Sequence, residues 1–240
     1  MSGHNKWSKI KREKGANDAR RGAIFTKIGN QIALAARGGI DPSMNPSLAL
    51  AVEKARSVNM PNANIQRAID RVSDKNAAVL EEITYEGVGP GGVGIIIEAA
   101  TDNKNRTLPE VRTALTKNGG RIADSGSVMF QFTRRGVITV DASGEDALLA
   151  VLDAGADDAN EEEGELIVYT DQKELNKVRE AIIASGLKVK DAELQYVPNM
   201  TVAVEDSDTA QKIFRLMDVL DDLDDVVNVH GNAEITAEIE

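Results

Sequence analysis

A cluster of cationic side chains near the N-terminus is the part of this sequence whose residue types could do specific chemistry. The stretch KWSKIKREK holds five Lys or Arg residues around one tryptophan, and the group consists of Lys6, Trp7, Lys9, Lys11, Arg12 and Lys14. Cations that neutralise phosphates release condensed counterions, and this release dominates affinity for nucleic-acid backbones. A tryptophan among them can stack on an unpaired base. The cluster therefore predicts contact with a polyanion.

Two plainer interpretations of the cluster stay open. The cations could be solvated charge on a chain terminus that binds nothing. Trp7 could be a hydrophobic anchor that holds the segment against the helices that follow. Because the first sixteen residues lack a helical or strand period and contain two glycines, we interpret them as a loosely packed arm.

Five further cations could extend the predicted binding surface. Arg20, Arg21 and Lys27 belong to the next predicted helix, where Arg20 and Lys27 fall in one strip beside the apolar face. Lys104 and Arg106 precede a later predicted helix, and phosphate could sit against such a helix N-terminus. The alternative for that second pair is a polar loop that only caps its helix.

The charge of the chain is divided unequally along its length. The whole sequence has 28 Lys or Arg and 39 Asp or Glu, a formal net charge of −11. Residues 1–75 hold 14 basic and 6 acidic side chains, whereas residues 76–240 hold 14 and 33, with no Lys or Arg between Gly136 and Gln172. A basic lobe on an acidic body orients that lobe toward a polyanion.

Composition limits the class of protein. A length of 240 residues predicts two or three domains. The absence of cysteine excludes disulfides and thiolate metal sites. The longest apolar runs are too short to span a bilayer, and no apolar targeting segment opens the chain. We therefore expect a soluble, cytoplasmic protein without a membrane partner.

The glycine-rich stretch GVGPGGVG has the spacing of a dinucleotide-binding fingerprint. That fingerprint needs a helix directly after the glycines, with its N-terminus facing the pyrophosphate. Here the strand-like run IIIEAAT follows, and Pro90 lies inside the loop. The stretch instead predicts a tight connection between two strands.

Other signs of catalysis are also missing. The acidic run DDANEEEGE lacks the ligand spacing of a calcium loop, so we interpret it as a solvated edge loop. The two histidines, His4 and His230, lie far apart in sequence, and neither shows a carboxylate partner. We expect a monomeric, non-enzymatic protein that uses no cofactor, metal ion or small-molecule substrate.

Hydrophobic periodicity predicts three short helices over residues 17–75. The first ends at Gly38 and Gly39, the second begins near Pro46, and the third follows Pro61. Their apolar stripes are Ile24, Ile28 and Ile32, then Leu48, Val52 and Ala55, then Ile65, Ile69 and Val72. None of these helices suggests the side-chain set of a major-groove reader, and no heptad pattern predicts a dimer.

After residue 80 the pattern changes to strands and helices. ITYEG, GIIIEAAT, SVMFQFT, TVAVE and VVNVHGN are typical of strands. Two helices are predicted between them: TLPEVRTALTKNGG, opened by a capping box from Thr107 to Glu110, and TAQKIFRLMDVLDDL. Together they form the β-α-β then β-α-β order of a ferredoxin-like unit, and the intervening stretch repeats that order.

These elements predict an α+β fold with three domains. A helical N-terminal domain with a basic arm occupies residues 1–78. A ferredoxin-like α/β domain consists of residues 79–133 plus 200–240. A second ferredoxin-like α/β domain, residues 134–199, is inserted in a loop of the first.

Several long motifs resemble the YebC/PmpR family over essentially the full chain. They include MSGHNKWSKIK, KGANDARRGAIFTKI, TYEGVGPGGVGIIIE and the paired prolines around DPSMNP. The resemblance implies a helical N-terminal domain and two α/β domains, one inserted in the other. It also implies that the arm residues Lys6, Trp7, Lys9, Lys11 and Arg12 matter for binding.

Members of that family are usually described as transcriptional regulators that bind DNA. A mitochondrial relative is a translational activator of cytochrome oxidase, and bacterial members are linked to translation of proline-rich stretches on the ribosome. The resemblance therefore implies a cytoplasmic regulator of gene expression that binds DNA through its basic N-terminal region. One alternative is a translation factor that binds ribosomal RNA and relieves stalling. Another is a protein-interaction scaffold whose acidic domains bind a partner protein.

Overall fold

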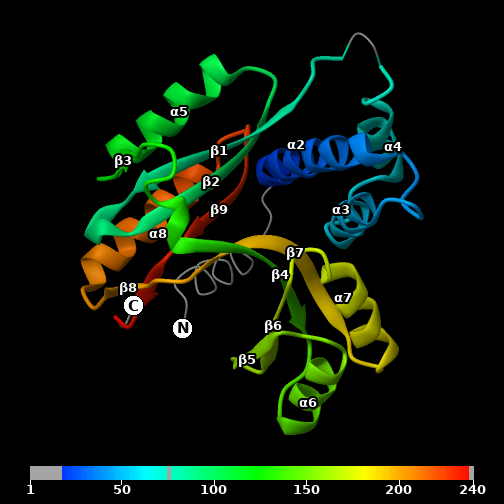
Figure 1. The fold of residues 1–240 in the computed structure, drawn as a ribbon. Coiled ribbons are helices and arrows are strands. Elements are labelled where there is room, and N and C mark those ends of the chain that lie inside the picture. The colour runs from blue at the N-terminus through cyan, green and yellow to red at the C-terminus, as the bar shows by residue number, and fades with distance from the viewer. Residues whose placement is uncertain (1–17, 75–76, 238–240) are drawn as a thin grey trace. The chain divides into compact units, whose positions relative to one another are not determined.

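The computed structural model describes residues 18–74 and 77–237, with side chains from residue 21 onward (Figure 1). Its first part is the helical domain, which consists of α2 (Asp18–Ala35), the short 3-10 helix η1 (Ala36–Gly38), α3 (Pro46–Ser57) and α4 (Asn62–Asp70). Each helix buries one apolar stripe. The shared core consists of Ile28, Ile32, Ala36, Leu48, Val52, Ala55, Met60, Ile65 and Ile69.

Two ends in this domain follow from local chemistry. Asn45 caps α3, because its side-chain oxygen accepts the backbone N–H of Leu48 at 3.2 Å. The last helix stops two residues earlier than its predicted apolar stripe. Val72 is 41% exposed, and its N–H turns back onto the carbonyl of Ile69 in a tighter turn. The prediction that Val72 continues the buried face was wrong.

The next part is an outer α/β domain built on an antiparallel sheet with the strand order β3-β1-β2-β9. The strands are β1 (Glu81–Val88), β2 (Gly94–Thr101), β3 (Arg121–Ile122) and β9 (Val226–Gly231). The two helices of the domain are α5 (Lys104–Lys117) and α8 (Ser207–Asp221). Two further strands, β8 (Val202–Val204) and β10 (Ala233–Ile235), pair in parallel as a separate sheet.

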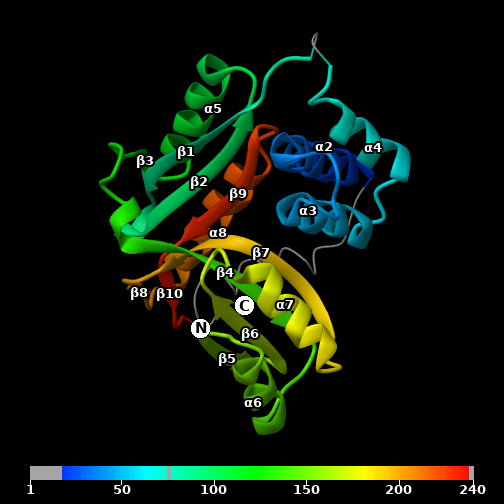
Figure 2. The ribbon, with the colours of Figure 1, turned by 45° about the vertical axis from the view of Figure 1, so that its right-hand side comes forward.

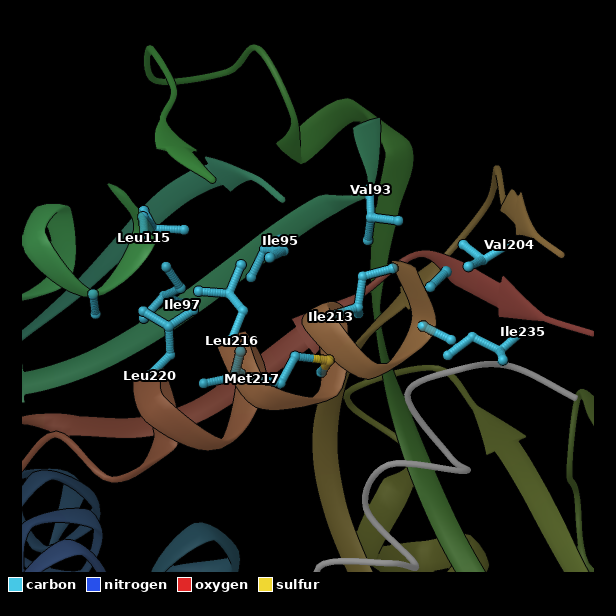
Figure 3. Packing of buried hydrophobic residues seen from close by; sticks show 14 of the residues in the cluster. Val93, Ile95, Ile97, Leu115, Val204, Ile213, Leu216, Met217, Leu220 and Ile235 are labelled. Atoms are coloured by element: carbon cyan, nitrogen blue, oxygen red, sulfur yellow. The ribbon is translucent and has the colours of Figure 1, made fainter. Parts of the chain in front are cut away.

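The core of the outer domain lies between this sheet and its two helices. Figure 3 shows Ile95 and Ile97 of β2 pointing toward Leu216 and Leu220 of α8, with Leu115 of α5 beside them. All five side chains are fully buried. Full burial of a large aliphatic side chain contributes about 1.5–3 kcal/mol, so this layer holds the domain together.

The strands of the outer sheet are not all the predicted ones. The predicted strand TVAVE contains β8, which pairs with β10 and is not part of the outer sheet. Within the outer sheet, β1 lies between β2 and β3. SVMFQFT is mostly a turn and a 3-10 helix, η3 (Met129–Gln131), and only its last two residues enter a strand. The cause is the buried carboxylate of Glu86, which accepts the backbone N–H groups of Gly126, Val128 and Met129. These N–H groups are therefore not available to a sheet ladder.

The inserted α/β domain has a sheet of its own with the order β5-β6-β4-β7, which is the ferredoxin-like order. Its elements are β4 (Phe132–Val140), α6 (Glu145–Asp153), β5 (Asp158–Glu162), β6 (Glu165–Thr170), α7 (Leu175–Ala184) and β7 (Val189–Pro198). Figure 2 shows α7 lying across the sheet. A β-carbon at Gly136 would lie 2.9 Å from that of Leu175, so only glycine lets α7 approach β4 this closely.

The predicted fold class is confirmed: the chain is α+β, with N-terminal helices followed by α/β domains, one inserted in the other. Backbone contacts divide it into two compact units, Met1–Phe132 with Pro198–Glu240, and Thr133–Val197. The three-domain boundaries stay a prediction, and we return to their test below.

The acidic run forms an edge hairpin rather than a loop. β5 pairs only with β6, and the turn between them uses Glu163 and Gly164, both with positive φ. Exposed carboxylates along an edge strand prevent it from pairing with another chain. Among the described residues, no group of three or more acidic or histidine side chains could hold a metal ion. No helix in residues 18–74 or 77–237 is long and apolar enough to cross a membrane.

Candidate nucleic-acid interface

The predicted arm lies outside the part of the chain that the structure describes. This holds for Lys6, Trp7, Lys9, Lys11, Arg12 and Lys14, and for the side chain of Arg20. Arg21 is the first predicted cation whose side chain is described. It is exposed on α2, and its guanidinium lies 6.0 Å from the centre of the Phe25 ring. Arg21 is therefore an exposed cation whose charged group lies over an aromatic face.

Lys27 is not on an accessible surface, contrary to the prediction. The residue is only 9% exposed, and its Nζ lies 3.8 Å from Oδ2 of Asp221 on α8. The helical strip that contains Lys27 is the flank of α2 that turns toward the outer domain. A buried ammonium must stay close to a carboxylate, because an uncompensated charge in the interior costs several kcal/mol. Lys27 thus has a structural role.

Lys104 and Arg106 neutralise carboxylates of their own domain. Lys104 Nζ lies 2.6 Å from Glu81, and the Arg106 guanidinium binds both oxygens of Asp225 and also Asp102. The helix they belong to begins three residues before the predicted capping box, with Asn103 as its cap. Here the alternative, a polar loop that caps its helix, describes the geometry better than a phosphate site.

The predicted cap residue Thr107 binds the carboxylate of Asp225 instead of capping the helix. This carboxylate accepts the hydroxyls of Thr107 at 2.6 Å and Thr101 at 3.0 Å, besides Arg106. Burial by itself would raise the pKa of Asp225, but the hydrogen bonds from Thr107, Arg106 and Thr101 outweigh it and hold the pKa below the ordinary aspartate value. The carboxylate therefore stays ionised and locks α5 to the start of β9.

His230 has a carboxylate partner that its sequence neighbours did not reveal. Its Nε2 lies 2.9 Å from Oε2 of Glu98, and the two residues are buried on the neighbouring strands β9 and β2. Asn228 donates to the same carboxylate oxygen at 3.2 Å. Since His230 is only 2% exposed, this pair is a polar contact inside the sheet layer and offers no access to a substrate.

The second and third helices of the helical domain have a connection that sequence reasoning did not single out. Residues 58–61 join α3 to α4, and Asn59 adopts a left-handed conformation with φ of 58°. Met60 is buried in the helical core, and its N–H donates to the carbonyl of Ala55. A turn of this length between two helices is typical of helix-turn-helix units, whose second helix contacts base edges.

The solvent-facing side of α4 carries side chains of the kind that contact bases. Asn62 at the start of the helix, Gln66 on its flank and Arg67 opposite the core are exposed. Ile65 and Ile69 hold the helix in the core. Amides pair with adenine and guanidinium with guanine in the major groove. The Gln66 amide donates to Asp70 at 2.8 Å, which orients it along the helix. The expectation that no helix has the side-chain set of a major-groove reader stays a prediction, and α4 is the helix on which to test it.

This face could have been found from the sequence. Once Ile65 and Ile69 are assigned to the core, a turn of about 100° per residue places Arg67 on the far side of the helix and Gln66 on its flank. Asn62 lies beside the apolar stripe and is exposed at the start of the helix. The apolar stripe predicts the helix but does not by itself single out the polar side chains that stay exposed. Arg67 is positioned further by the side chain of Asn64, whose oxygen lies 3.5 Å from Nη1.

Two protein-family models match the chain. Residues 5–75 match the TACO1/YebC protein N-terminal domain, and residues 80–233 match the TACO1/YebC second and third domain. The break between the two models falls in the connection between α4 and β1.

Individual relatives agree with these matches. A "probable transcriptional regulatory protein" of Chloroflexus aurantiacus is 49% identical, over 100% of this chain and 98% of the relative. One of the same description from Moorella thermoacetica is 46% identical, again over 100% of this chain and 98% of the relative. The crystal structure of a conserved hypothetical protein from Aquifex aeolicus has a TM-score of 0.87 at 40% identity, covering 92% of this chain and 93% of that one. The chain therefore belongs to the TACO1/YebC family, whose members include proteins named as transcriptional regulators.

Proposed function

We propose that this protein is a non-enzymatic regulator of gene expression that binds DNA through its helical domain and the basic arm before it. The observation that carries the proposal is the set of exposed side chains on α4, which follows a four-residue turn and includes Asn62, Gln66 and Arg67. These side chains are suited to base edges, and the helices behind them are fixed by a common core. The names of the relatives support a regulator.

The arm and α4 have different tasks in this proposal. Contacts from Lys and Arg to phosphates supply affinity and position but carry no sequence information. We assign that task to Lys9, Lys11 and Arg12 of the arm. Base contacts supply specificity, and we assign these to Gln66 and Arg67 of α4.

A titration with two kinds of variant tests this division. Fluorescence anisotropy measures binding to promoter DNA, random DNA and structured ribosomal RNA at several stated salt concentrations. Changing Lys9, Lys11 and Arg12 together to Gln should weaken binding to all nucleic acids and lower the salt slope by about 2–3. Changing Gln66 and Arg67 to Ala should instead reduce the preference for promoter over random DNA by about 10-fold or more, because a good base contact contributes about 1–3 kcal/mol.

Arg56→Ala is the matched control for the loss of charge at Arg67. Arg56 is exposed on α3, outside the face of α4, so its loss should affect promoter and random DNA equally. If wild-type protein shows no preference among DNA sequences but binds ribosomal RNA more tightly, the translation-factor alternative replaces this proposal. If the wild-type protein binds no nucleic acid at all, the result contradicts this proposal and favours the protein-interaction scaffold.

A further inference from the structure

The cations of the outer domain fall into two groups with opposite surroundings. Lys104 and Arg106 lie at the N-terminal end of α5 and pair with acidic residues there. The other five are exposed residues, and within the described part of the chain none of their side chains makes a hydrogen bond or ion pair. They are Arg112, Lys117, Arg121, Lys212 and Arg215. The chain thus pairs the cations at the start of α5 with carboxylates, and leaves those farther along α5, on β3 and on α8 without an ion pair among the described residues.

Three of these cations belong to the elements that lie next to the turn between β1 and β2. Arg121 pairs in register with Val88, directly before the turn that contains Pro90, Gly91 and Gly92. Lys117 ends α5 two residues before Gly119, whose β-carbon would lie 3.6 Å from Pro90. In Figure 1 the end of α5, strand β3 and this turn lie at the same end of the sheet.

The first turns of α8 bring the third cation to the same place. A β-carbon at Gly91 would lie 3.2 Å from Cγ2 of Thr209, and Lys212 follows Thr209 by about one helical turn. Asp208 lies directly before Thr209 and is exposed, and Asp206 caps α8 by accepting the N–H and the hydroxyl of Thr209 at 2.8 and 2.6 Å. The hydrogen bonds from Thr209 lower the pKa of Asp206, and the nearby charge of Lys212 lowers it further.

The turn itself offers little side chain to a ligand. Gly91 and Gly92 are exposed and have positive φ, of 71° and 80°, which glycine adopts at little cost. A polymer can therefore approach the backbone between the flanking cations. We define the glycine-turn surface by its residues Pro90, Gly91, Gly92, Lys117, Arg121 and Lys212.

We propose that the glycine-turn surface binds the phosphate backbone of the nucleic acid that the helical domain holds. The inference rests on the proposed function and adds a second contact in a different domain. Separated cations on an open surface can bind a nucleic-acid backbone, because contacts to phosphates require positive charge but not a pocket. Protein interfaces, in contrast, are centred on buried aromatic or aliphatic anchors. Among the described residues, no exposed large hydrophobic side chain lies on α5, on α8 or in the turn.

The expected effect follows from counterion release. Changing Lys117, Arg121 and Lys212 together to Gln should lower the slope of log K against log salt by about 2–3, if each cation meets one phosphate. It should also weaken binding to duplex DNA at low salt by more than 10-fold. Because the three side chains are exposed and unpaired within the described residues, the thermal midpoint should hardly change.

A matched control distinguishes the loss of contacts at the glycine-turn surface from the loss of net charge on the whole protein. Changing Lys173, Lys177 and Arg179 to Gln removes the same charge from the inserted domain. This control should lower affinity only slightly, as expected from the long-range field. A charge-preserving variant, with Lys117 and Lys212 changed to Arg and Arg121 changed to Lys, should bind as wild type. Anisotropy titrations of all variants at four salt concentrations, beside the arm variant of Lys9, Lys11 and Arg12, complete the test.

The outcomes distinguish this inference from the function on which it rests. If the arm variant loses affinity while the glycine-turn variant matches the inserted-domain control, the second contact is wrong and the proposed function stands. If neither variant differs from the control, both are wrong. If the glycine-turn variant keeps DNA affinity but loses binding to an acidic polypeptide such as poly-glutamate, the surface serves an acidic protein and the inference is overturned.

Discussion

At the scale of single residues, two buried carboxylates hold irregular segments in place. Glu86 accepts three backbone N–H groups from residues 126–129 at 2.5, 2.7 and 2.8 Å. Burial by itself would raise the pKa of Glu86, but these hydrogen bonds outweigh it and keep the pKa below the ordinary value. Asp225 has the same balance, with donors from side chains.

These two residues predict how stability depends on pH. A carboxyl whose pKa is lower in the folded than in the unfolded state adds stability that is fully present above its unfolded pKa, about 4. That stability is lost as the pH falls from about 4 through the lower pKa values that the two carboxyl groups have in the folded state. Urea unfolding of the whole chain between pH 6 and pH 2 should show this loss, and Glu86→Gln with Asp225→Asn should flatten it.

The same double variant should be less stable at pH 7, by about 2–4 kcal/mol, because charged acceptors of several hydrogen bonds are replaced by weaker ones. Glu110→Gln is the control, since Glu110 is exposed on α5. A double variant whose pH profile has the same shape as that of wild type would contradict the assignment of these two carboxylates.

At the scale of elements, the position of α4 depends on one left-handed residue. Asn59 has φ of 58°, a conformation that asparagine tolerates and a β-branched residue does not. Asn59→Val should lower stability by about 1–2 kcal/mol, whereas Asn59→Gly should leave it nearly unchanged or raise it. Thermal unfolding of the two variants measures this difference.

The effect of the turn on DNA binding can be measured with the same two Asn59 variants. If α4 contacts bases, Asn59→Val should reduce the preference for promoter DNA more than it reduces affinity for random DNA. Asn59→Gly keeps the turn and should keep the preference. Equal stability of the Val and Gly variants would show that the turn does not constrain α4.

At the scale of the whole molecule, the inserted domain predicts independent folding. It has its own four-stranded sheet, and its ends enter and leave through the adjacent strands β4 and β7. Excising residues 134–199 and joining Thr133 to Met200 through a short linker should leave a remainder that unfolds cooperatively. The excised domain should do the same. Calorimetry of both fragments is the measurement, and non-cooperative unfolding of both would refute the nested boundaries.

The sequence by itself determined the features that depend on local pattern. The stripes ending in Ile32, Ala55 and Val72 predicted three amphipathic helices, because each helix must bury its own apolar face, although Val72 itself is exposed. The order of strands and helices predicted α/β domains with one inserted in the other. Charge along the chain predicted a basic N-terminal lobe, since composition needs no coordinates.

Only the tertiary structure decided what depends on partners that are distant in sequence. Lys27 becomes buried because Asp221 lies beside it, and Arg106 pairs with Asp225, more than a hundred residues away. The strand expected at SVMFQFT gives way to a turn because Glu86 takes its N–H groups. Which cations remain available to a polyanion is likewise a tertiary property. A side chain's charge is fixed by its type, but its accessibility depends on the carboxylates that the fold places next to it.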